Sequence, residues 1–141
     1  MKKKPQSTYQ PSQYEEMSVT RLKAANKRIT SARTLVMRAL EDATVSLSAY
    51  DIHSKVKNSG HTVDVVSVYR ILVDLMELDL IYYVGHLRGY FRKVHGTNAV
   101  QFNRETRECK ELLIDQATID AILYECTYCQ AVKFHLELEV I

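Results

Sequence analysis

The sequence predicts an α+β fold, in which an N-terminal winged helix-turn-helix is followed by a small α/β dimerisation domain. Apolar residues recur at helical spacing, between capping residues, from residue 14 to residue 81. A pair of β-rich segments around two glycines follows, and residues 95–141 then alternate strand-like and helix-like patterns. We therefore expect a flexible basic arm at 1–13, a winged-helix DNA-binding domain at 14–94 and a dimerisation domain at 95–141.

The first three helices are predicted from their start signals. The arm has a lysine run and two prolines and too few apolar residues to order itself, and helical patterning then runs from Tyr14 to about Asn26. Thr30 is expected to cap a second helix over 31–40. Ser48, with Asp51 at the capping-box position, is expected to start a third helix that ends near 58–60.

The stretch from Thr62 to Ile81 predicts a helix that buries one face and presents the other to a binding partner. Helical spacing places on its buried face Val65, Val68, Leu72, Leu75 and Met76, and on its other face Ser67, Arg70, Asp74 and Glu77. An arginine pairs with guanine edges or phosphate, and a tyrosine contacts thymine methyls or phosphate. Tyr69 and Arg70 therefore predict contacts in a DNA major groove. The alternatives are a core tyrosine and an Arg70–Asp74 pair within the helix.

The segment LIYYVGHLRGYFRKV predicts a two-stranded hairpin, because two β-rich runs flank residues 85–89. In a winged helix-turn-helix this hairpin is the wing. We expect it to point its basic side chains toward backbone phosphates, namely His86, Arg88, Arg92 and Lys93.

The C-terminal part predicts two strands, a helix and a last strand. AVQFN and KELLI are the first two strands around a polar turn at 104–108, Asp115 opens a helix over 115–132, and residues 133–141 alternate apolar and polar side chains. A unit of this size has little core of its own. We therefore expect its apolar faces to pair with a second copy of the chain, which predicts a homodimer.

Composition and charge bound the function classes. Residues 1–95 hold 15 Lys and Arg against 9 Asp and Glu, whereas residues 96–141 hold 4 against 8. This asymmetry fits a nucleic-acid reader joined to an assembly module. The sequence shows no membrane span, no signal peptide and three cysteines, so we expect a cytoplasmic protein with reduced thiols. It also shows no Ser/His/Asp set, phosphate loop or carboxylate pair, so we do not expect an enzyme.

From about Leu22 to Val94 the chain resembles the ferric uptake regulator family of bacterial winged-helix repressors. LKAANKRITSARTLVMRAL resembles that family's first two helices, LSAYDIHSKV its Leu-Ser-Ala-Glu-Glu-Ile-Tyr helix, VVSVYRILVDLMELDLI its Ala-Thr-Val-Tyr-Arg-Thr-Leu recognition helix, and YFRKV the second strand of its wing. The resemblance implies double-stranded DNA as the partner. It places groove contacts on Tyr69 and Arg70, a loop contact on Arg28 and a backbone contact on Arg33, with Ser67 in place of the usual threonine.

The metal motifs of that family are altered in this chain. Members usually carry a His-rich run and a pair of CxxC motifs that hold structural zinc, whereas this chain has His95-Gly96-Thr97-Asn98 and a single CxxC. We therefore expect no metal cofactor. The alternative is zinc or iron, held by Cys109, Cys126, Cys129 and His135, or at a weakened site that uses His86 and His95.

These inferences predict a sequence-specific transcriptional regulator that binds a palindromic operator as a homodimer, without a metal. Two alternatives remain open. The first is an altered metal, haem or redox sensor that uses the same cysteines and histidines. The second is a winged-helix module that binds a protein, in which the basic face meets an acidic partner.

Overall fold

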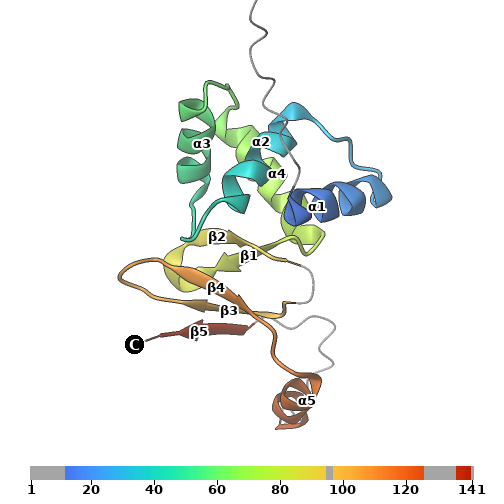
Figure 1. Ribbon diagram of the computed structural model, residues 1–141, viewed down its shortest axis with the longest axis vertical. Helices are drawn as coiled ribbons and strands as arrows, with labels where there is room; N and C mark the ends of the chain where they lie inside the picture. The colour runs from blue at the N-terminus through green and yellow to red at the C-terminus, as the bar shows by residue number, and fades with distance from the viewer. Residues whose placement is uncertain (1–11, 95–96, 126–135, 141) are drawn as a thin grey trace, which may run out of the picture.

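The computed structural model describes residues 12–94, 97–125 and 136–140 of the chain (Figure 1). Its elements in chain order are α1 Gln13–Ala24, α2 Ser31–Glu41, α3 Ala49–Asn58, α4 Val65–Glu77, β1 Ile81–Val84, a 3₁₀ turn at Gly85–Leu87, β2 Gly89–Arg92, β3 Ala99–Phe102, β4 Cys109–Leu112, α5 Gln116–Glu125 and β5 Leu136–Glu139. This order confirms the predicted α+β class. Most of the predicted basic arm lies outside the described residues.

Side-chain caps fix where the helices begin. Thr30 accepts the backbone N–H of Arg33, and Ser48 forms the predicted capping box with Asp51. Ser12 and Asp64 cap α1 and α4 in the same way, through bonds that the sequence analysis did not predict. Each cap satisfies a backbone N–H that has no partner within the helix, so each boundary is set locally by the sequence.

The helices α1 to α4 pack around one apolar core, whose fully buried members include Leu22, Met37, Leu40, Ile52, Leu72 and Leu75. The buried stripe of α4 differs from the prediction, because Ile71 is buried, Val65 is only partly buried and Met76 is 38% exposed. The reason is angular. The four buried residues, Val68, Ile71, Leu72 and Leu75, span about 100° of the helix circumference, and Val65 and Met76 lie just beyond that arc on the side of Leu72.

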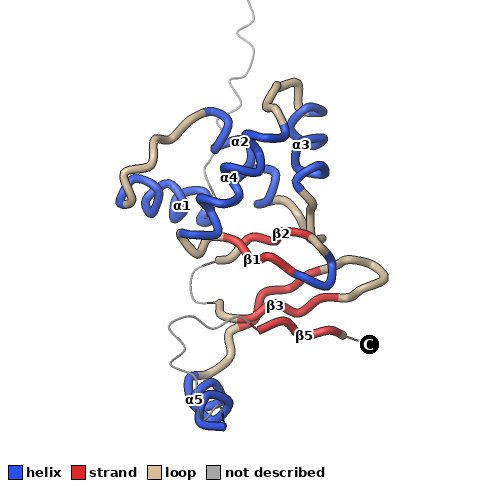
Figure 2. Tube along the Cα trace, turned by 180° about the vertical axis from the view of Figure 1, so that it is seen from behind, coloured by secondary structure: helices blue, strands red, loops and turns tan. Residues whose placement is uncertain are grey.

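The strands form two small sheets, of which the hairpin β1–β2 lies next to the helices and the second sheet lies beyond it (Figure 2). One is the antiparallel hairpin β1–β2, in which Ile81 pairs with Arg92 and Val84 with Gly89. The other has the order β4-β3-β5, with β4 antiparallel and β5 parallel to β3.

The segment 44–47, between α2 and α3, joins the two sheets. On one side, the backbone groups of Leu47 and Tyr90 exchange hydrogen bonds of 2.9 and 2.7 Å. On the other side, the Ser46 N–H donates to the Arg107 carbonyl and the Cys109 N–H donates to the Thr44 carbonyl, both at 3.0 Å. Backbone pairing therefore runs from the hairpin through this segment to β4.

A second apolar cluster reinforces this connection. The hairpin contributes Tyr82, Val84, Leu87 and Phe91, and the neighbouring sheet contributes Val100 and Phe102. In contrast, α5 stands apart from the helices in both views, and its Tyr124 is 85% exposed (Figure 1). No helix among the described residues is long and apolar enough to cross a membrane.

Candidate nucleic-acid interface

The start of α4 is fixed by Asp64. One carboxylate oxygen of Asp64 accepts the Ser67 N–H at 2.9 Å, and the other accepts the Ser67 hydroxyl at 2.7 Å. These bonds lower the pKa of the Asp64 carboxyl. The predicted DNA contact Ser67 is therefore already engaged in the cap of its own helix. The cap also sets the rotation of α4, and so decides which side chains of its second turn face outward.

Tyr69 and Arg70 are presented to solvent on that second turn. Tyr69 is 44% exposed, so it is not a core residue, and Arg70 is also exposed. The pairing of Arg70 with Asp74 is not seen, because the Asp74 carboxylate accepts hydrogen bonds from Lys27, at 3.1 Å, and from Arg33. The structure therefore leaves the phenol and the guanidinium of the predicted reading pair accessible to a partner.

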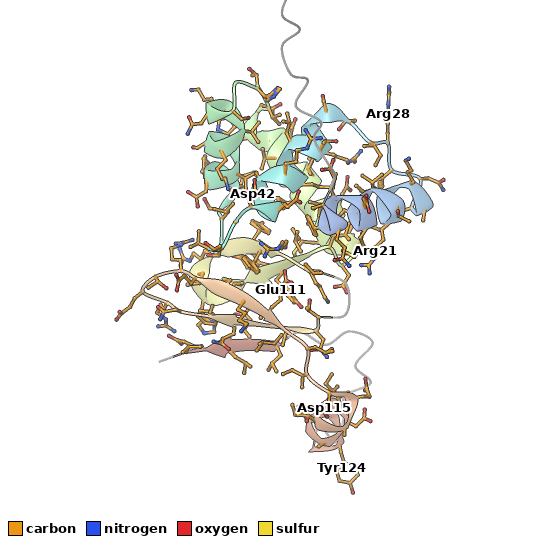
Figure 3. All side chains as sticks on the ribbon, in the orientation of Figure 1. Arg21, Arg28, Asp42, Glu111, Asp115 and Tyr124 are labelled. Carbon is orange, nitrogen blue, oxygen red and sulfur yellow. The ribbon has the colours of Figure 1, made fainter. Side chains whose placement is uncertain are left out.

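Arg28 and Arg33, the two arginines predicted to contact DNA near the start of α2, differ in exposure. The Arg33 side chain is 17% exposed, and its guanidinium donates to Asp74 and to the Arg28 carbonyl. Burial alone would raise the pKa of Asp74, but hydrogen bonds from Arg33 and Lys27 outweigh it and lower that pKa. Arg28 itself is exposed and extends from the α1–α2 loop away from the protein (Figure 3).

Of the basic residues predicted on the wing, Arg88 is exposed at the turn between β1 and β2, with φ of 49°, and His86 is exposed as well, whereas Arg92 and Lys93 are not. Arg92 donates instead to the carbonyls of Glu41, at 3.0 Å, and Ala43, at 2.6 Å, and its Nε lies 3.6 Å from Glu111 Oε1. These contacts brace the hairpin against the end of α2.

The other two wing residues also have partners within the fold. Lys93 Nζ lies 2.8 Å from Asp79 Oδ2 and its side chain is 14% exposed. His86 Nδ1 lies 3.2 Å from Glu137 Oε2, and its ring stacks on Phe102 at 5.6 Å between centroids. The structure therefore does not bring Lys93 to the exposed face of the hairpin, and it turns His86 toward β5.

One residue of this surface was missed by the sequence analysis. Tyr50 is 64% exposed on the first turn of α3, and its ring meets that of Tyr69 edge-on at 6.4 Å. Val66 and Val73, 55% and 54% exposed, lie on the same side of α4. The signal was present in the sequence, because the position after Ala49 in a capped first turn faces outward and a tyrosine there has no core to fill.

The candidate metal ligands do not form a site within the part of the chain that the structure describes. No group of three or more His, Cys, Asp or Glu side chains among those residues could hold an ion. Burial raises the pKa of the Cys109 thiol to about 11, which disfavours the thiolate that a metal needs. His86, another predicted ligand, lies beside Glu137 without a further donor that would complete a site among the described residues. The remaining predicted ligands lie outside the described residues, namely His95, Cys126, Cys129 and His135.

Comparison with known proteins identifies the fold. No family model matches the sequence, and no curated protein matches it. Among solved structures, holo XcZur matches with a TM-score of 0.73 at 17% identity, covering 92% of this chain and 95% of that one. A zinc uptake regulator in complex with zinc and DNA matches with a TM-score of 0.71 at 18% identity, covering 93% of each chain. The ferric uptake regulator of Pseudomonas aeruginosa with manganese matches with a TM-score of 0.61 at 22% identity, covering 87% and 96%.

These structures also correct one prediction. We expected no metal cofactor, because the His-rich run and the paired CxxC motifs are missing. The matching structures are described with manganese or zinc, and this finding contradicts the expectation, which was wrong. The missing motifs alone did not justify it. The resemblance itself is confirmed at the level of structure, since over most of its length this chain has the fold of the ferric and zinc uptake regulators.

Proposed function

We propose that this protein is a sequence-specific DNA-binding transcriptional regulator, which acts as a homodimeric repressor on a partly palindromic operator. The observation that carries the proposal is the exposed pair Tyr69 and Arg70 on the second turn of α4. The fold supports it, since a zinc uptake regulator with this fold is described in complex with DNA. In this proposal α4 enters the major groove of double-stranded DNA.

The exposed side chains around α4 divide between base reading and positioning. We assign Arg70 to a guanine edge, and the rings of Tyr69 and Tyr50, which meet edge-on, to apolar contacts with thymine methyls. Arg28 and Arg88 are exposed, and their side chains make no hydrogen bond or ion pair with another described residue. They are the cations that we assign to backbone phosphates on either side of the groove.

The homodimer is proposed from the edge of the second sheet. Strand β5 lies at the end of the order β4-β3-β5, and Leu138 and Val140 are 37% and 42% exposed there. Leu113 and Ile122 add further exposed apolar surface on this unit. A second copy would cover this surface and the open strand edge. Two copies of α4 related by a two-fold axis then require two half-sites in the operator.

A metal ion belongs to the same proposal, because the matching structures are described with manganese or zinc. The described donors do not complete a site, so we place the ligands among Cys126, Cys129, His95 and His135. Native mass spectrometry of protein purified without chelator should report a dimer with bound ions, and Cys126→Ser with Cys129→Ser should lose them. A metal-free dimer would reject this part of the proposal.

The DNA proposal is tested with Arg70→Ala. Binding sites are first selected from random duplexes with the wild-type protein, and affinity is then measured by fluorescence anisotropy at several salt concentrations. Loss of one bidentate base contact should cost about 1 to 3 kcal/mol on the selected operator and much less on a scrambled duplex. The matched control is Lys110→Ala, since Lys110 is exposed on β4, at the edge of the second sheet opposite to β5. Equal operator affinity for both variants, or binding insensitive to salt, would reject the mechanism.

A further inference from the structure

Four tyrosines from four different elements gather beside α4. Tyr50 lies on α3, Tyr69 on α4, Tyr83 on β1 and Tyr90 on β2. The rings of Tyr50 and Tyr69 meet at 6.4 Å with an interplanar angle of 87°, and those of Tyr83 and Tyr90 meet at 5.2 Å and 55°. We call these four residues the tyrosine band.

The two ring pairs belong to one surface. Tyr83 and Tyr90 are direct partners in the antiparallel register, so their side chains leave the same face of the hairpin. Tyr90 packs against the helical core, and its backbone is bonded to Leu47, just before the start of α3. Burial raises the pKa of Tyr90, and the neighbouring Tyr83 and then Tyr69 raise that pKa further. The band thus runs from α3 across α4 to the hairpin.

The exposure of these rings indicates a surface that contacts another molecule. Tyr50, Tyr69 and Tyr83 are 64%, 44% and 39% exposed. A fully buried tyrosine would serve packing alone, whereas these three side chains are partly exposed to solvent. Tyrosine suits a surface that contacts another molecule, because one end of it is apolar and the other donates a hydrogen bond.

The charges around the band favour a polyanion as that partner. Arg70 follows Tyr69 on α4, and Arg88 stands at the turn of the hairpin that carries Tyr83. Both guanidinium groups are exposed, whereas the hairpin cations Arg92 and Lys93 are held by internal partners. The face beside α4 therefore combines neutral hydroxyls with two exposed cations.

We propose that the tyrosine band is a second contact line on DNA, in which the hydroxyls of Tyr50 and Tyr83 donate hydrogen bonds to backbone phosphates beside the groove that α4 enters. Tyr69 and Tyr90 position these two residues through their ring contacts. The inference rests on the proposed function and deepens it, because it assigns to neutral donors the positioning role that the sequence predicted for basic residues of the wing.

A neutral donor leaves a signature that a cation does not. When Lys or Arg neutralises a phosphate, counterions are released, so each such contact steepens the fall of affinity with salt. A phenol hydroxyl adds a hydrogen bond to the phosphate without releasing counterions. Its removal should therefore weaken binding by the same factor at every salt concentration, on any DNA sequence.

The experiment uses Tyr50→Phe, Tyr83→Phe and the double variant, because Phe keeps the ring and removes the hydroxyl alone. Anisotropy titrations at four KCl concentrations compare the selected operator with a scrambled duplex. Each variant should bind about 3- to 10-fold more weakly on both duplexes, with the slope of log affinity against log salt unchanged. Arg88→Ala should instead reduce the size of that slope by about one.

Tyr124→Phe is the matched control, since Tyr124 is 85% exposed on α5, far from the helices (Figure 3), and it should bind as the wild type does. Wild-type affinity in the double variant would overturn the inference while leaving the proposed function intact. A loss confined to the operator would overturn the phosphate assignment, because it would mean base contact. A wild-type protein that binds neither duplex would overturn the proposed function, and the band with it.

Discussion

Phe91→Ala tests whether the hairpin and the second sheet are one cooperative unit. Phe91 is 2% exposed on β2, and its cluster includes Val84 of the same hairpin and Val100 and Phe102 of the neighbouring strand β3. Truncation at Cβ removes the ring from between the two sheets. The loss therefore falls on contacts that join the two sheets as well as on contacts within the hairpin.

The expected cost is about 4 kcal/mol. A buried phenylalanine removes about 150 to 250 Å² from water, which at about 25 cal/mol per Å² corresponds to about 4 to 6 kcal/mol. Measured Phe→Ala costs in cores are about 3 to 5 kcal/mol, depending on how far the site collapses. Here collapse is limited, because segment 44–47 is hydrogen-bonded to the hairpin on one side and to the second sheet on the other.

Urea unfolding followed by far-ultraviolet circular dichroism measures this cost. All samples must have one protomer concentration, because the stability of an oligomer depends on it. We expect a single transition whose midpoint falls by about 2 M, given a slope of about 2 kcal/mol per molar urea. The control Val66→Ala, at a residue 55% exposed on α4 and outside the proposed dimer surface, should shift stability by less than about 0.5 kcal/mol. A loss under about 1 kcal/mol, or two transitions of which only one moves, would refute the reasoning.

Three further predictions concern charge and thiol chemistry. Asp74→Ala leaves the largely buried Arg33 without its carboxylate and should cost about 2 to 4 kcal/mol in thermal unfolding; an unchanged melt contradicts this. Because the pKa of Asp74 is lowered in the folded protein, its stabilisation is complete above the unfolded value of about 3.9 and is lost as the pH falls through the folded value. The free energy of unfolding, measured with urea between pH 2 and 5, should therefore depend less on pH in Asp74→Ala than in the wild type. Because burial raises the pKa of Cys109 to about 11, peptide mapping should show slower alkylation of Cys109 at pH 8 in folded than in unfolded protein, and equal rates would refute its burial.

Much of the fold was predictable because its determinants are local. Thr30, Ser48 and Asp51 lie next to the backbone groups that they cap, and apolar spacing identifies a helix within a few turns. The glycines around the hairpin turn and the alternation of the last strand act over similarly short distances. These signals predicted the order of the elements, and each of them is visible without knowledge of what the element packs against.

The candidate site was predictable only in part, because its basic residues are decided by distant partners. Arg33 is exposed by helical spacing alone, yet it meets Asp74, which lies 41 residues away in sequence. Arg92 meets the carbonyls of Glu41 and Ala43, 51 and 49 residues away. Nothing in the sequence near either arginine signals these contacts, so residue type alone overestimated the charge available to DNA.

These internal contacts bear directly on how the protein would bind DNA. The resemblance and the wing pattern together assign six cations per chain to DNA, whereas the structure leaves Arg28, Arg70 and Arg88 exposed and engages Arg33, Arg92 and Lys93 within the fold. Each phosphate contact contributes about −0.9 to the slope of log affinity against log salt. Arg70 is assigned to a base edge, so it is left out of the phosphate count. A homodimer that uses Arg28 and Arg88 on phosphates should show a slope of about −4, and one that also uses Arg33, Arg92 and Lys93 a slope of about −9. A measured slope near −9 would mean that DNA competes successfully for Arg33, Arg92 and Lys93. Binding would then break the ion pairs that brace the hairpin and α2. A slope near −4 would mean that these pairs persist on DNA.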